Sequence, residues 1–187
     1  MTDGWQPAHR LAPVRLGKGA FILFAAVVAI QGVHVFEHVL QLVQVYVLGI
    51  PDEQAFGILG YVFQFQGTEE WLHLAFNSLF VVSLYILAVP LLRLGSAIPR
   101  LTLPIFVVGA VALESWHVVE HVVIISNVIQ NQGCPCPGIV DALTGLSDTV
   151  LHLGYNLAAY AALLSAFLAI ARSPRSSTQS PIAMAHA

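Results

Sequence analysis

Long apolar stretches alternate with short polar segments along this chain of 187 residues. Four of them, at roughly 19–50, 71–92, 101–130 and 149–171, each hold more than 20 residues. About 20 helical residues cross the hydrocarbon core of a bilayer, and such stretches are far too long for strands. The pattern predicts an all-α integral membrane protein, a bundle of four transmembrane helices over 19–171.

The composition narrows the class further. Only 9% of the residues are Asp, Glu, Lys or Arg, whereas soluble domains carry about 25%. The seven Lys and Arg are outnumbered by ten Asp and Glu, so the chain has no basic surface for nucleic-acid phosphates. The expected partner is therefore the lipid bilayer, and nucleic acid is excluded.

The positions of the basic residues indicate how the helices are oriented. All of them precede the first stretch, separate the second from the third, or follow the fourth: Arg10, Arg15, Lys18, Arg93, Arg100, Arg172 and Arg175. The other two loops are acidic, with Asp52, Glu53, Glu69, Glu70, Asp141 and Asp148. Cytoplasmic loops are enriched in Lys and Arg, so both termini are expected on the cytoplasmic side of the cell membrane. Residues 1–18 are then a cytoplasmic segment, and the Ser- and Pro-rich 172–187 a disordered cytoplasmic tail.

Two sequence patterns occur twice. His34-Val-Phe-Glu37-His38 in the first stretch matches His117-Val-Val-Glu120-His121 in the third. In the second and fourth stretches an acid, a His and an Asn follow one another at intervals of four: Glu69, His73 and Asn77, then Asp148, His152 and Asn156. The matches predict two parallel two-helix repeats, related by a pseudo-twofold axis along the membrane normal.

Helical geometry places these polar residues on one face of each helix and, counted from the expected cytoplasmic ends, in two layers of the outer half of the bilayer. An ionisable side chain that faces lipid costs about 2.5–3.5 kcal/mol, so the polar faces are expected to point into the bundle. Imidazole and carboxylate groups at such spacings are how helical bundles present metal ligands. We therefore predict eight ligands: His34, Glu37, His38, His73, His117, Glu120, His121 and His152.

This ligand set suits two transition-metal ions, or one ion with the remaining residues as supporting groups. Nitrogen and oxygen ligands without thiolate suit iron, copper, zinc or manganese, and open positions for oxygen activation favour iron or copper before zinc. Asn77, Asn156, Glu69 and Asp148 are expected to support the ligands.

Glu114 has no counterpart in the first repeat, where Gln31 takes its place. It is either a buried carboxyl group, protonated or hydrogen-bonded to Gln31, or a catalytic group on a proton path to the site. Cys134 and Cys136, with one residue between them, are too close for an unstrained disulfide. Metal capture, an intermolecular bond and free thiols all remain open for them.

These features favour a metal-dependent oxidoreductase of the oxidase or oxygenase type, acting on a lipophilic or small substrate. An electron-donor protein or a second copy of the chain would be its partner. The alternatives are a metal-ion binding or transport protein, a zinc-dependent hydrolase, and a haem b protein with two axial histidines. The hydrolase is considered because His-x-x-Glu-His resembles the inverted zinc-protease motif.

Overall fold

The computed structural model describes residues 16–63, 69–95, 98–131 and 137–172, apart from the side chains of Glu53, Phe63 and Glu69. Helices make up all the regular structure in these ranges, and no strand is found in them. Lys18–Tyr46, Glu70–Leu94, Thr102–Gln130 and Asp148–Ala171 are long and apolar enough to cross a membrane. The predicted all-α fold with four candidate spans is confirmed, which indicates a multi-pass membrane protein.

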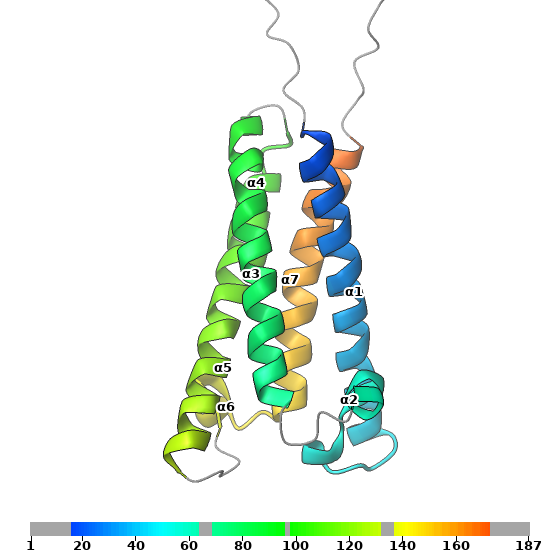
Figure 1. Ribbon diagram of the computed structural model, residues 1–187, viewed down its shortest axis with the longest axis vertical. Helices are drawn as coiled ribbons and strands as arrows, with labels where there is room; N and C mark the ends of the chain where they lie inside the picture. The colour runs from blue at the N-terminus through cyan, green and yellow to red at the C-terminus, as the bar shows by residue number, and fades with distance from the viewer. Residues whose placement is uncertain (1–15, 64–68, 96–97, 132–136, 173–187) are drawn as a thin grey trace, which may run out of the picture.

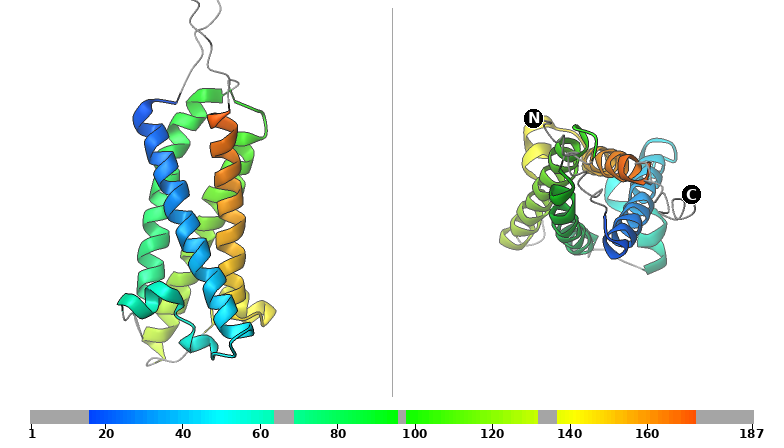
Figure 2. Two further views of the ribbon diagram at one scale, coloured as in Figure 1. Left: turned by 90° about the vertical axis from the view of Figure 1, so that its right-hand side faces the viewer. Right: turned by 90° about the horizontal axis from the view of Figure 1, so that it is seen from above.

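The four long helices stand side by side as an upright bundle (Figures 1 and 2). They are α1 (Lys18–Tyr46), α3 (Glu69–Leu94), the continuous run of α4 (Thr102–Pro104), η3 (Ile105–Ala112) and α5 (Leu113–Gln130), and α7 (Asp148–Ala171). The start of α1 and the end of α7 lie at one end of the bundle (Figure 1). Three short helices lie at or near the other end: η1 (Asp52–Gln54), α2 (Gly57–Phe63) and α6 (Ile139–Thr144).

Two features of the helices differ from the prediction. The first helix ends at Tyr46, four residues before the predicted limit at 50, and Gly49 follows with a positive φ of 69°. That conformation suits glycine and not a helix interior. In the third helix η3 is a π-helix, a form that hydrophobic periodicity does not distinguish from an α-helix.

The interior is apolar in the half of the bundle nearer the two described termini. Its core is formed by Phe24, Val27, Val28, Phe80, Leu84, Leu87, Leu91, Leu94, Ile98, Phe106, Ala110, Val111, Ala162, Leu163 and Ala166. A Cβ on Gly109 would lie 2.6 Å from that of Ala162, so this glycine allows η3 and α7 to pack closely.

The other half of the interior is polar. Its buried side chains are Gln31, His34, Glu37, His38, Asn77, Glu114, His117, Glu120, His121, His152 and Asn156, and His73 is half-buried among them. The prediction that the polar faces point into the bundle is confirmed, and the candidate ligands share one region.

Candidate metal centre

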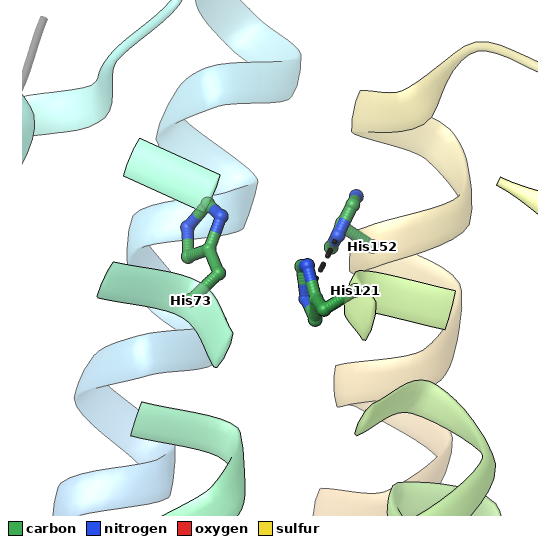
Figure 3. Close-up of side chains that lie close together, drawn as sticks. All are labelled: His73, His121 and His152. Atoms are coloured by element: carbon green, nitrogen blue, oxygen red, sulfur yellow. Dashed lines mark hydrogen bonds between the residues drawn. The ribbon is translucent and has the colours of Figure 1, made fainter. Parts of the chain in front are cut away.

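Three histidines from three helices converge in the polar half. His73 of α3, His121 of α5 and His152 of α7 each offer a ring nitrogen, and these atoms lie within 4.8 Å of one another (Figure 3). No other group of three or more His, Cys, Asp or Glu comes as close in the described ranges. His121 and His152 are buried and His73 is half-buried, so the cluster is largely shielded from solvent.

Carboxylates hold two of these rings from behind. His121 Nδ1 lies 3.0 Å from Glu70 Oε2, and His152 Nδ1 lies 3.0 Å from Asp148 Oδ1. An ionised carboxylate only accepts hydrogen bonds, so each Nδ1 donates, and each Nε2 then carries a lone pair when the ring is neutral. Metal-ligating histidines are oriented in this way, by a carboxylate on the nitrogen that does not bind the metal.

The two free nitrogens face one another. His121 Nε2 lies 3.2 Å from His152 Nε2. When both rings are neutral and hydrogen-bonded to the acids through Nδ1, two lone pairs at this distance repel unless a proton or a metal ion lies between them. Two ligands about 2.05 Å from a tetrahedral metal are about 3.3 Å apart, so the spacing fits a shared metal ion.

A second pair of histidines lies on α1. His34 Nε2 and His38 Nε2 are also 3.2 Å apart, and His38 Nδ1 donates to Gln41 Oε1 at 2.7 Å. The ring of His34 stacks on Phe76 with centroids 4.2 Å apart. One turn of helix thus gives two imidazoles the same Nε2 separation as the pair on α5 and α7, but with ring planes 78° apart instead of 38°.

His117 and Glu114 lie beside the three-histidine cluster without joining it. The ring of His117 is 5.1 Å from that of His152, and its Nδ1 is 3.4 Å from Glu114 Oε2. Gln31, the alternative partner considered for Glu114, instead donates to Asn156 at 2.7 Å. No hydrogen bond joins Gln31 to Glu114 in the part of the chain described here.

Several polar atoms of this layer lack hydrogen-bond partners in the described structure. They are Gln31 Oε1, His73 Nδ1, both polar atoms of the Asn77 side chain, Glu114 Oε1 and His117 Nε2. A buried polar group left unpaired costs about 1–3 kcal/mol, so such a concentration indicates bound water, ions or another polar ligand.

The two glutamates of the His-x-x-Glu-His motifs make a different kind of contact. Glu37 Oε1 accepts a hydrogen bond of 2.5 Å from the Leu59 amide in α2. Glu120 accepts bonds of 2.6 and 2.9 Å from the Ile139 and Val140 amides in α6. Glu37 and Glu120 therefore fasten the short helices at this end of the bundle, and neither belongs to the three-histidine group.

Glycines make both contacts sterically feasible. A Cβ on Gly57 would lie 2.2 Å from Glu37 Oε1, and a Cβ on Gly138 would lie 2.5 Å from Glu120 Oε2. Any larger residue would push the carboxylate away from the backbone amides.

Of the predicted supporting residues, Asp148 holds His152, Asn156 donates to the His152 carbonyl at 2.9 Å, and Asn77 is fully buried. The side chain of Glu69, together with Cys134 and Cys136, lies outside the described residues. Sequence reasoning missed Glu70. The sequence shows Glu70 in the acidic loop, but its contact with His121 joins two helices, and no sequence spacing within one helix indicates such a contact.

The loop end of the bundle is negatively charged. Partial burial, followed by the charges of Asp148, Asp52 and Glu120, raises the pKa of Asp141 above its ordinary value. The negative electrostatic potential of these neighbouring carboxylates would favour the approach of cations.

Comparisons with protein-family models, curated proteins and solved structures find no match for this chain. The functional proposal therefore rests on the chemistry of the site.

Proposed function

We propose that this protein is a multi-pass cell-membrane metalloprotein that binds a transition-metal ion through His73, His121 and His152. The facing Nε2 atoms of His121 and His152 carry the proposal, because acids hold both rings so that two lone pairs point at one position. Three histidine ligands leave a fourth position free, as in catalytic metal sites.

The reaction class that we propose is metal-dependent oxidation or oxygenation of a small or lipophilic substrate. Imidazole ligands without thiolate suit iron, copper and zinc, and the first two supply redox chemistry when bound. The largely buried site limits the access of water to that chemistry. The chain would contribute binding, through the histidines, and orientation, through Glu70 and Asp148.

Metal transport is the competing proposal, and the fold supports it less. A conducting path would have to continue through the half of the bundle that is filled by Phe24, Leu84, Phe106, Leu163 and their neighbours. Intramembrane ion pathways are instead lined by ionisable groups.

We also propose that both termini are cytoplasmic and that two parallel repeats form the bundle. The start of α1 and the end of α7 lie at one end of the bundle together with the end of α3, whose last turn holds Arg93 (Figure 1). Glu37 and Glu120 make matching contacts, each with the short helix that follows its own span. The metal centre would then lie in the outer half of the membrane.

Metal analysis of the purified protein tests the site. After expression in medium replete with iron, copper and zinc, the wild type and a His9→Ala control should retain metal, whereas His121→Ala should lose most of it. Metal-free wild type would overturn the proposal, and full metal content in His121→Ala would show that the ligands are wrong. Cobalt(II) bound to the metal-free wild type should show the absorption bands of a nitrogen-ligated ion. This test uses the wild type alone, so it does not depend on the folding of a variant.

The reaction class has its own test. Reduction with dithionite and reoxidation by air should change the optical or paramagnetic spectrum of the protein as isolated. Zinc as the native metal would refute the oxidoreductase proposal and favour hydrolysis or metal binding. A Soret band in the absorption spectrum would show that the protein binds haem and would refute the three-histidine metal centre.

A further inference from the structure

We infer that a groove between α1 and α3 binds one anionic phospholipid, with an acyl chain in the groove and the phosphate group at Lys18 and Arg93. The groove lies in the apolar half of the bundle, at the opposite end from the histidines. Binding of the lipid does not require a metal ion, so this site is independent of the proposed metal centre.

The groove lies where α1 begins and α3 ends, which is the same end of the bundle (Figure 1). Its volume is about 460 Å³, and no lining residue has a polar side chain. The lining includes Gly19, Ala20 and Leu23 of α1 and Ile86, Val89 and Pro90 of α3. A Cβ added to Gly19 would have no other element within 4 Å, so the small size of this residue keeps the space open.

The depth of the groove suits an acyl chain. On α3 the lining runs from Ile86 to Pro90, and the helix ends at Leu94. The eight residues from Ile86 to Leu94 are about 12 Å of helix, and half of a bilayer core is about 15 Å thick. The groove therefore extends from the headgroup boundary into one leaflet, as a phospholipid does.

Two basic residues stand next to the groove on the headgroup side. Arg93 follows Ile86 by seven residues and Pro90 by three, so it lies on the same face of α3 as these lining residues. Lys18 is the first residue of α1 and directly precedes Gly19. Both side chains are exposed, and no acid pairs with either of them in the described ranges. Their charges are therefore available to a phosphate group.

The charge of the surrounding helix ends favours an anionic lipid over a neutral one. The ends of α1, α3 and α7 that meet here carry Lys18, Arg93 and Arg172. No Asp or Glu occurs in the segments that contain these ends, 16–36, 71–95 and 149–172. Basic residues beside transmembrane helices attract anionic headgroups, and each one raises the affinity about fivefold.

Native mass spectrometry of the wild type in detergent counts bound lipids directly. Titration with phosphatidylglycerol should show one tightly bound molecule per chain. Phosphatidylcholine with identical acyl chains should bind about 25-fold more weakly, because its choline group cancels the phosphate charge that Lys18 and Arg93 recognise. Inorganic phosphate should not displace the bound lipid, because the groove holds the acyl chain.

Two pairs of variants distinguish recognition of the headgroup from recognition of the chain. Arg93→Gln should weaken binding of phosphatidylglycerol about fivefold, whereas Arg172→Gln, which removes the same charge at the end of α7, should have a smaller effect. Gly19→Leu should fill the groove and abolish tight binding. Gly154→Leu, at an exposed position of α7 with no other element near its Cβ, should bind as the wild type does.

Equal affinities of the wild type for the two lipids would refute the proposed recognition of the anionic headgroup. Unchanged binding by Gly19→Leu would show that the lipid does not occupy the groove. A lipid-free dimer that dissociates in Gly19→Leu would show instead that a second copy of the chain covers this surface. The comparison of the two lipids uses the wild type alone, so its answer does not depend on the folding of a variant.

Discussion

Replacement of Glu70 by Gln should weaken metal binding more than any other change that leaves all the histidines in place. The substitution keeps the size of the side chain but removes the anionic acceptor 3.0 Å from His121 Nδ1. The ring then loses its preference for the orientation and tautomer that point a lone pair at the metal. Loss of such a partner lowers metal affinity by about 10–100-fold.

The structure indicates where in this range two variants should fall. Glu70 is the only hydrogen-bond partner of His121 Nδ1 in the described ranges, and its side chain is 29% exposed. His152 Nδ1 has a second acceptor, the Asp148 carbonyl at 2.9 Å, and the Asp148 side chain is 47% exposed. We expect a loss of about 100-fold, or about 2.7 kcal/mol, for Glu70→Gln, and about tenfold, or about 1.4 kcal/mol, for Asp148→Asn.

Competition with a chromophoric chelator measures both affinities in detergent. Asp141→Asn is the matched control, because it removes one negative charge at the same end of the bundle from a residue that makes no hydrogen bond or ion pair with a histidine in the described ranges. A larger loss for Asp148→Asn than for Glu70→Gln would refute the reasoning. So would equal affinities of Glu70→Gln and the control.

Three other predictions follow from the structure. Gly138→Ala should lower the free energy of unfolding by about 1–3 kcal/mol, because the new Cβ would displace Glu120 from two backbone amides. Gly154→Ala, inside α7 with no other element within 4 Å of its Cβ position, should instead raise it by about 0.5–1 kcal/mol; chemical denaturation compares the two. A reporter fused after Arg175 should be active only in the cytoplasm, and activity outside would refute the proposed topology. The raised pKa of Asp141 favours its protonated form in the folded state, so that its contribution to stability is present below about pH 4 and is lost as the pH rises through the raised value. The melting temperature of Asp141→Asn, relative to wild type, should therefore rise between pH 3 and pH 7, and a constant difference would contradict the assignment.

The fold and the polar layer could be predicted because both depend on local periodicity. Length and hydrophobicity define the spans, and the intervals between His34 and His38 or between Asp148 and His152 place each pair on one helical face. The cost of exposing such groups to lipid then leaves only the interior. Burial of the predicted polar residues follows from these two facts.

Partnerships between elements could not be predicted in this way. Glu37 lies on the ligand face of its helix, but its carboxylate reaches an amide of α2, a helix too short to show periodicity. Glu70 contacts His121, 51 positions away along the chain. The sequence pattern instead singled out Glu69, because it precedes His73 by one helical turn. Which of several inward-facing groups meet depends on helix rotation and loop path, and the sequence pattern carries neither.

The depth of the histidines along α1 has an electrical consequence. His38 lies eight residues from the end of this helix at Tyr46, about 12 Å of its total length of about 42 Å. With the termini in the cytoplasm, an ion that reaches the site from outside crosses about 0.3 of the membrane voltage. Each charge gains about 2.3 kcal/mol per 100 mV across the full membrane, so a dication gains about 1.4 kcal/mol at this depth. A potential of 100 mV, negative inside, would therefore raise the occupancy of the centre as much as a tenfold increase in external metal concentration, and an energised cell would load the protein more readily than detergent does.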